Sequence, residues 1–174
     1  MTYRTIVPLL LLSLAVLALP GCPPSWPEPP FDTTGTYTGT WSGQPSEGEE
    51  VNECPLTITL TQNLNANYPG DHAVSGTVVV DYSCFELPEW VGTPPPSTVN
   101  VGGLLGDDGT LTLLSGGCGT GLCVVLALSG TGVDADGDGD MDSYSGTWSY
   151  SLLLAGVQPL TVTGTFEVAV DDGA

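Results

Sequence analysis

The sequence almost lacks basic side chains. Arg4 is the only lysine or arginine, against 20 Asp and Glu residues, and the formal net charge at pH 7 is −19. Every acidic residue lies after residue 21, whereas Arg4 lies before it. The chain after residue 21 therefore has no lysine or arginine that could clamp a phosphate. Its negative field repels nucleic acid and attracts cations. We therefore expect no nucleic-acid partner, and two explanations of the acidity stay open: solubility in a saline habitat and cation binding.

A catalytic set of side chains is also missing. His72 is the only histidine, and it lies beside the turn signal at Pro69 and Gly70 with no serine or cysteine placed to act with it. Nucleophilic catalysis needs a nucleophile, a base and an orienting group within mutual reach. We therefore expect that the protein is not an enzyme and that His72 is a solvent-exposed turn residue.

The N-terminus carries a long apolar stretch. Residues 6–19 are apolar apart from Pro8 and Ser13, and Arg4 precedes them. The stretch is too short to span a bilayer comfortably, and it lies directly before a site of small residues. This arrangement is typical of a signal peptide for export, which we assign to residues 1–21.

The residues Leu19, Pro20, Gly21 and Cys22 resemble the lipobox of bacterial lipoproteins. The resemblance implies that Cys22 receives a diacylglycerol, that the signal peptide is removed, and that the new amine is acylated. Two or three acyl chains anchor a protein stably, whereas one chain holds it only marginally. We expect a lipid-anchored protein of the cell envelope, at the outer membrane or cell surface rather than the cytoplasmic membrane. The alternative is a secreted protein in which Cys22 forms a disulfide.

The rest of the chain divides into a tether, one domain and a short tail. Prolines are frequent in residues 22–34, which predicts an extended spacer between the membrane and the domain. Residues 35–170 are rich in Gly, Thr and Val and show no helical periodicity, which predicts one all-β domain. Residues 171–174 are expected to form a frayed tail.

Alternation of apolar and polar residues predicts half-buried antiparallel strands. The expected strands are 35–43, 54–62, 73–84, 99–105, 110–114, 123–132, 143–154 and 160–170. The loop at residues 107–109 fits a three-residue turn that sets Leu105 against Leu111. We predict an eight-stranded antiparallel up-and-down meander that closes into a barrel, with a two-sheet β-sandwich as the alternative.

A glycine between a hydroxyl residue and a threonine recurs on the inward face of the expected strands. The positions are Gly39, Gly76, Gly130, Gly146 and Gly164. Glycine inside a strand marks a bend or a close neighbour, and such kinks allow a sheet to coil and close.

The first strand, with Gly39 and Trp41 in the run Thr-Gly-Thr-Trp, and the meander that follows resemble the calycins, in particular the avidin and streptavidin type. The resemblance implies that Trp41 packs the closed end of the barrel. The avidin-type biotin ligand two residues after that tryptophan is an asparagine, and Gly43 stands here instead. Biotin binding is therefore not expected.

Four cysteines follow Cys22: Cys54, Cys84, Cys118 and Cys123. An even number in an exported domain indicates two disulfides, with three connectivities, and metal ligation by thiolates is the competing interpretation. The apolar pattern pairs the second and third strands as Leu60 with Val78, Ile58 with Val80, and Leu56 with Tyr82. Because that register sets Cys54 opposite Cys84, we expect the disulfides Cys54–Cys84 and Cys118–Cys123.

Residues 134–142 carry an aspartate at every second position and resemble the calcium loops of EF-hands, dockerins and thrombospondin type 3 repeats. The implied calcium ligands are Asp134, Asp136, Asp138, Asp140 and Asp142. Of these, Asp140 would bind through its backbone carbonyl and Asp142 through water. Ser145 replaces the bidentate glutamate, so we expect weak affinity, on the order of 0.1–1 mM. A solvated acidic turn is the alternative.

These features predict a lipid-anchored cell-envelope protein of structural or adhesion type that calcium stabilises. Its expected partner is the membrane, through the lipid on Cys22. The alternative function is a calycin-like carrier of a small apolar ligand. The interior separates the two, because a cavity of about 300 Å³ or more favours a carrier and a side-chain-filled centre favours a structural protein.

Overall fold

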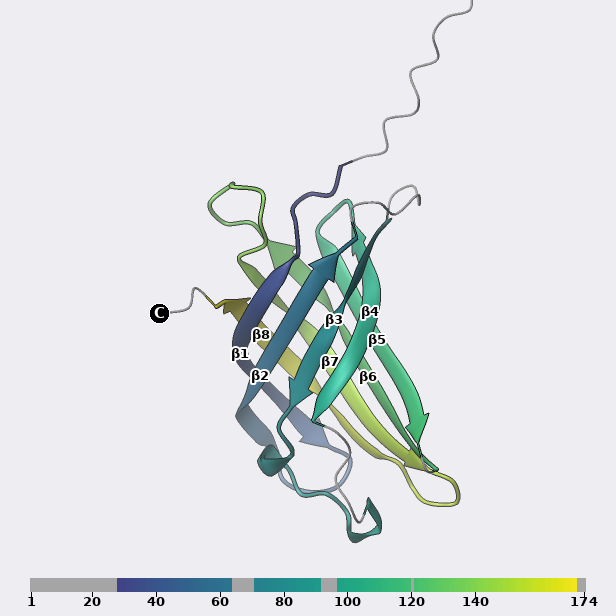
Figure 1. The fold of residues 1–174 in the computed structure, drawn as a ribbon. Coiled ribbons are helices and arrows are strands. Elements are labelled where there is room, and N and C mark those ends of the chain that lie inside the picture. The colour runs from purple at the N-terminus through teal and green to yellow at the C-terminus, as the bar shows by residue number, and fades with distance from the viewer. Residues whose placement is uncertain (1–27, 64–70, 92–96, 120, 172–174) are drawn as a thin grey trace, which may run out of the picture.

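Eight antiparallel strands form a closed barrel. The computed structural model describes residues 28–63, 71–91, 97–119 and 121–171. Each strand pairs with the next one along the chain, and the last strand pairs with the first (Figure 1). The predicted meander and closed barrel are therefore confirmed, and the sandwich alternative is wrong.

The strands are β1 (Gly35–Pro45), β2 (Val51–Gln62), β3 (Asp71–Val80), β4 (Thr98–Gly106), β5 (Thr110–Gly119), β6 (Leu122–Val133), β7 (Ser143–Leu154) and β8 (Leu160–Val170). Two 3₁₀ turns, η1 (Tyr82–Cys84) and η2 (Glu89–Val91), lie between β3 and β4. β7 and β8 have the predicted bounds. β5 is longer than predicted, because its pairing with β6 continues through the glycines to Gly119.

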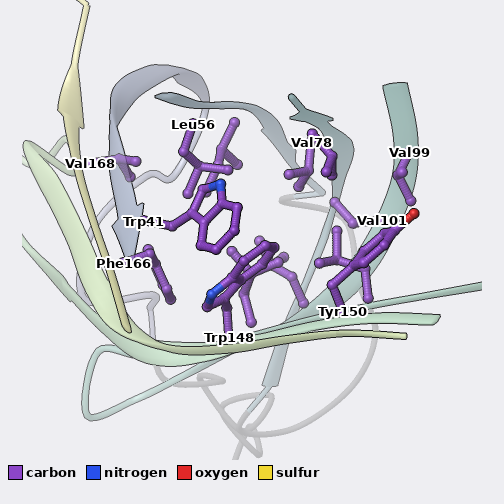
Figure 2. Packing of buried hydrophobic residues seen from close by; sticks show 14 of the residues in the cluster. Trp41, Leu56, Val78, Val99, Val101, Trp148, Tyr150, Phe166 and Val168 are labelled. Carbon is purple, nitrogen blue, oxygen red and sulfur yellow. The ribbon is translucent and has the colours of Figure 1, made fainter. Parts of the chain in front are cut away.

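Apolar side chains fill the inside of the barrel. Trp41 of β1 and Trp148 of β7 lie together, with their ring centroids 4.0 Å apart, and Figure 2 shows both among the inward side chains of the surrounding strands. The hydroxyl groups of Tyr82 and Tyr150 form a hydrogen bond of 2.6 Å at the edge of this cluster. Burying one large apolar side chain contributes about 1.5–3 kcal/mol, so this interior supplies most of the favourable free energy of folding.

The inward glycines allow neighbouring strands to approach closely, as predicted. A β-carbon at Gly164 of β8 would overlap the carbonyl oxygen of Ser42 on β1. The same overlap with a carbonyl oxygen of an adjacent strand occurs at Gly39, Gly76, Gly130 and Gly146. A side chain at any of these positions would push two strands apart.

The register of β2 and β3 differs from the predicted one by two residues. The predicted pairs are wrong: Leu60 with Val78, Ile58 with Val80, and Leu56 with Tyr82. The observed partners, in the same order, are Gly76, Val78 and Val80. Because side chains alternate with a period of two, this shift leaves the same face of each strand inward.

The end of β3 explains the error. The prediction continued the strand to Cys84, but β3 ends at Val80 and the chain turns into η1. Asp81 caps this turn, since its carboxylate accepts the amide of Ser83 at 2.8 Å. A hydrogen bond from the Ser83 hydroxyl, together with the one from its amide, holds the pKa of Asp81 below its usual range.

Both predicted disulfides are present, so the thiolate-metal alternative is wrong. Cys54 bonds to Cys84 with the Cα atoms 5.9 Å apart, although Cys84 reaches its partner from η1 and not from β3. Cys118 and Cys123 lie directly opposite each other on β5 and β6, with the Cα atoms 4.0 Å apart. That short separation is typical of an antiparallel pair that does not share backbone hydrogen bonds.

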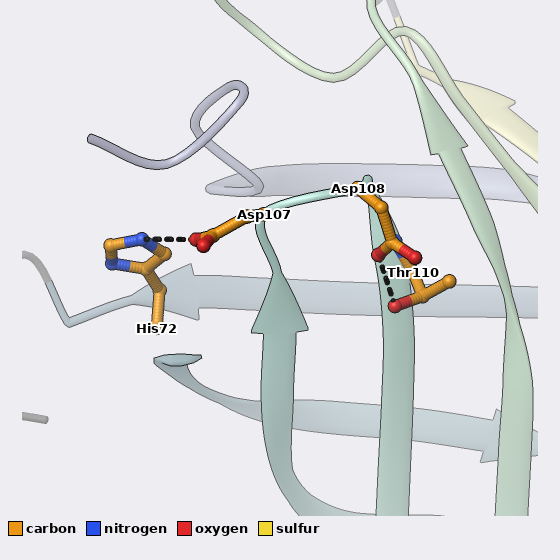
Figure 3. A network of polar contacts seen from close by, with 4 residues as sticks. All are labelled: His72, Asp107, Asp108 and Thr110. Atoms are coloured by element: carbon orange, nitrogen blue, oxygen red, sulfur yellow. Dashed lines mark hydrogen bonds and ion pairs between the residues drawn. The ribbon is translucent and has the colours of Figure 1, made fainter. Parts of the chain in front are cut away.

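The β4–β5 turn has the predicted geometry. Leu105 lies opposite Leu111, and Gly109 has a φ of 79°, in the left-handed region that favours glycine. The Asp108 carboxylate accepts the amide of Thr110 at 3.0 Å and its hydroxyl at 2.6 Å (Figure 3). The turn is therefore fixed by one glycine and one aspartate.

His72 does not lie in a solvent-exposed turn, so that prediction is wrong. The residue belongs to β3, where its side chain is only 13% exposed. Its Nε2 lies 3.9 Å from Asp107 Oδ1 at the neighbouring β4–β5 turn (Figure 3). The prediction failed because β3 begins before His72, where Asp71 pairs with Gly106.

We expect the substitution Gly164→Ala to destabilise the protein by about 1–3 kcal/mol, because the added methyl group forces β8 away from β1. The control is Gly116→Ala on β5, where a β-carbon would meet nothing within 4 Å. That variant should stay within about 0.5 kcal/mol of the parent. Urea unfolding followed by tryptophan fluorescence measures both, and equal stability of the two variants would contradict the close approach of β8 and β1.

Candidate functional site

The acidic loop, residues 134–142, connects β6 to β7 at the end of the barrel where β1 begins (Figure 1). Its conformation depends on Gly137 and Gly139, whose φ angles are 80° and 97°. Residues other than glycine rarely adopt these φ angles, so the glycines of the Asp-Gly repeat allow the chain to turn this tightly.

Aspartate side chains hold the loop in shape by accepting backbone amides. Asp134 accepts the amides of Gly137 and Gly139 at 2.7 and 3.0 Å. Asp136 and Asp138 each accept the amide two residues further on, at 3.1 and 2.9 Å. Because an ionised carboxylate has about four lone-pair sites, each of these side chains keeps acceptor capacity for another partner.

Three of the five predicted calcium ligands come together. Asp134, Asp136 and Asp138 each place a carboxylate oxygen within 4.8 Å of the others. Asp136 and Asp138 are exposed, whereas Asp134 is half-buried at the base of the loop. Calcium takes oxygen ligands at about 2.3–2.6 Å, so oxygens with this mutual spacing can share one ion.

The other two predicted ligands have different roles in the structure. The Asp142 carboxylate accepts the amide of Ala135 at 2.5 Å, which closes the base of the loop. Asp140 lies outside the three-carboxylate cluster, and its backbone pairs with Asp32. The negative charge of Asp138, with smaller effects of burial and of Asp32, raises the pKa of the Asp140 carboxyl.

The N-terminal strap, residues 31–34, is bonded to the acidic loop. The amide of Asp32 donates to the carbonyl of Gly139, and the carbonyl of Asp32 accepts the amide of Met141, both at 2.8 Å. Asp32 and Asp140 thereby form a parallel β-bridge. The last residues of the predicted tether are thus attached to the barrel at the acidic loop.

Sequence reasoning did not assign a role to Asp32. The signal was the run Asp-Thr-Thr after the last prolines, because aspartate often accepts an amide two residues further on and starts a turn. The structure contains this bond, from the amide of Thr34 to the Asp32 carboxylate at 2.8 Å. Pairing between the strap and a distant loop could not be read from either segment alone.

Phe31 and Met141 cover this end of the barrel. Both side chains are buried, with 7% and 2% of their surface exposed. Both lie against Gly132 at the end of β6, where a β-carbon would collide with the ring and with the sulfur. Phe31 also lies next to Gly109, whose carbonyl accepts the amide of Gly132 at 3.0 Å.

Buried hydrogen bonds attach the strap to β1 and β2. The amide of Thr33 donates to the side-chain oxygen of Gln62 at 2.7 Å, and the Tyr37 hydroxyl donates to the carbonyl of Thr33 at 3.0 Å. Burial, followed by the negative charges of Asp32 and the acidic loop, raises the pKa of Tyr37 to about 12. The strap, β1 and the acidic loop therefore form one connected unit.

The predicted lipidation site, Cys22, and the predicted signal peptide lie outside the residues that the structure describes. Among the residues that it does describe, no helix is long and apolar enough to cross a membrane. In comparisons with known proteins, no family model, no curated protein and no solved structure matches the chain.

We expect the free energy of unfolding to fall as the pH rises from about 10 to about 12. Tyr37 ionises near pH 10 in the unfolded chain and at about 12 in the folded protein. Its contribution is therefore complete below pH 10 and is lost as the pH rises through 12. The phenols of Tyr144 and Tyr150 add to the same trend, because burial raises the pKa of both.

The variant Tyr37→Phe separates the contribution of the strap. It should cost about 1 kcal/mol at neutral pH through the lost hydrogen bond to Thr33, and it should lose less stability between pH 10 and 12. Urea unfolding at several pH values measures both effects. An unchanged pH dependence in this variant would show that Tyr37 is not the buried phenol described here.

Proposed function

We propose that the protein is a lipid-anchored cell-envelope protein of structural or adhesion type, stabilised by calcium at the acidic loop. One observation carries the proposal: the three converging carboxylates lie on the loop to which the N-terminal strap is bonded. In the proposed arrangement the tether leaves the barrel beside a cation site. Calcium there would neutralise the mutual repulsion of the aspartates and stiffen the point of attachment.

The filled interior supports a structural role over the carriage of a ligand. Large inward side chains such as Trp41, Tyr144 and Tyr150 are less than 2% exposed. A hollow of about 370 Å³ lies at the opposite end of the barrel from the acidic loop. Glu47, Glu49, Glu50 and Glu86 are among its lining residues, so it does not suit an apolar ligand.

The resemblance of the leader to a lipobox supports the anchor, and the direction of the strap agrees with it. Residues 28–30 precede the strap and are not part of the barrel wall. A tether in that place would hold the acidic loop on the membrane side of the domain. The negative charges of an anionic membrane surface and of the acidic loop would then both concentrate calcium ions at the loop.

We expect 10 mM calcium to raise the melting temperature by a few degrees. A ligand that binds only the folded state stabilises it by RT ln(1 + [L]/Kd), which is about 1.4 kcal/mol at ten times a Kd near 1 mM. Magnesium should do less, because it demands tighter octahedral geometry and gives up its waters reluctantly. Differential scanning fluorimetry on the domain from residue 28 onward measures these shifts.

Two controls separate a specific site from screening of the negative charge. Sodium at matched ionic strength reports screening alone. The double variant Asp136→Asn, Asp138→Asn should lose the calcium increment, whereas Glu49→Gln, Glu50→Gln at the other end removes the same charge and should keep it. If calcium and sodium at matched ionic strength raised the melting temperature of the parent protein equally, the loop would be only a solvated acidic turn.

We expect the full chain to fractionate with membranes in a bacterial host that processes lipoproteins, and Cys22→Ser to move to the soluble fraction. The reason is that two or three acyl chains on Cys22 would anchor the protein stably. Immunoblots of the two fractions test this, with Ser25→Ala as a matched control that keeps the cysteine. Membrane retention of Cys22→Ser would contradict the proposed anchor.

A further inference from the structure

The wall of the barrel has an open seam between β4 and β5. These strands pair only from Gly102 with Leu114 to Leu105 with Leu111. Figure 1 shows the two strands side by side near their connecting turn and diverging toward the opposite end. On their other sides both remain paired, β4 with β3 from residue 98 onward and β5 with β6 as far as residue 119.

The direction of the backbone groups in the seam follows from the neighbouring ladder. The carbonyl of Ser97 accepts the amide of Val80 at 2.7 Å, so Ser97 faces β3. Since successive residues of a strand point their N–H and C=O groups to opposite sides, Thr98 and Asn100 face the seam. Gly102 faces the same way as Thr98 and Asn100, and it pairs with Leu114 of β5. By the same alternation along β5, the backbone groups of residues 116 and 118 also face the seam.

These backbone groups have no partner across the seam in the described part of the chain. Thr98, Asn100, Gly116 and Cys118 are all exposed. Each carries one donor and one acceptor in the strand geometry that another strand would match. A row of such groups is satisfied by water, or by an extended peptide that adds to the sheet.

We propose that the β4–β5 seam binds an extended, positively charged peptide segment of a partner protein by strand addition. The segment pairs with Thr98 and Asn100 of β4. The exposed Leu104 and Leu114 flank the point where the strands meet.

Charge selects this occupant over a second copy of the chain. The connections at the end where the seam opens carry several acids: Glu47, Glu49, Glu50, Asp81, Glu86 and Glu89. The described residues contain no lysine or arginine to balance them. A second copy would bring the same net charge of −19 and be repelled, whereas a segment with lysines is attracted.

The probe is a peptide of about eight residues that alternates valine and threonine and has lysine at both ends. We expect saturable binding to the domain by isothermal calorimetry at low salt. Replacing the lysines by glutamate should abolish detectable binding. Methylating the backbone nitrogens on one edge should do the same, because it removes donors and leaves the side chains in place.

The variant Asn100→Pro tests the location. It removes an N–H that faces the seam and breaks no β3–β4 hydrogen bond, so proline is tolerable on this edge. Binding should weaken about tenfold or more, whereas the control Asn100→Ala, which keeps the N–H, should bind like the parent. Unchanged melting temperatures verify the fold of both variants.

Several results would overturn the proposal. Binding of the N-methylated peptide or of the glutamate peptide as strong as that of the probe would exclude strand addition or charge selection. Equal binding by Asn100→Pro and Asn100→Ala would exclude the seam. Sedimentation that finds a dimer in the parent but not in Asn100→Pro would make a second copy the occupant. If Asn100→Pro fails to fold, the N-methylated peptide alone decides.

Discussion

The pairing of β1 with β8 is the constraint on which the rest of the structure depends. The ladder runs from Tyr37 with Val170 to Pro45 with Val162, and it joins the first strand of the domain to the last. Without it the eight strands would be an open sheet with two long edges and an apolar face in water. The glycines at 39 and 164 permit this contact, because a side chain at either would overlap the backbone of the facing strand.

The closed barrel has two ends, and different segments of the chain pack at each of them. At one end the backbone of the strap is bonded to the acidic loop, and the Phe31 side chain of the strap is buried together with Met141. At the other end, residues 82–91 pack against the core through Phe85 and Trp90, and the disulfide from Cys54 to Cys84 holds them. Closing such a loop covalently lowers the conformational entropy of the unfolded chain, which stabilises the folded state by roughly 3–4 kcal/mol in the chain-entropy model.

The two ends agree with the proposed roles. The end that carries the strap is where a tether would leave, so a cation that stiffens the acidic loop would act where the tether joins the barrel. The opposite end, where the seam opens, would then point away from the membrane. A barrel placed in this way would hold its peptide-binding edge outward from the surface.

Period-two alternation was enough to predict the strands, the meander and the inward face. The glycines added the prediction of closure, since they mark where strands touch. The Cys54–Cys84 disulfide followed from the same pattern, although the register behind it was wrong by two residues. It failed because the alternation of Val78, Val80 and Tyr82 continues past the true end of β3, which Asp81 sets by capping a turn.

Other features could not be predicted because they join segments distant in the sequence. The strap looks like the end of a proline-rich tether until its backbone is seen to pair with the acidic loop. His72 resembled a turn residue because the start of β3 depends on its partner β4. The seam leaves no signal in the alternation of β4, and the glycines that precede Cys118 are as compatible with a paired strand as with an open one.

Native-state hydrogen exchange followed by NMR tests the central claim most directly. If the barrel is closed, amides that bond across β1 and β8 exchange only by global unfolding, with the same free energy as those between β6 and β7. That is the result the account predicts. Opening of β1 at a free energy several kcal/mol below that of the β6–β7 ladder would contradict it, because the sheet would then be an open one.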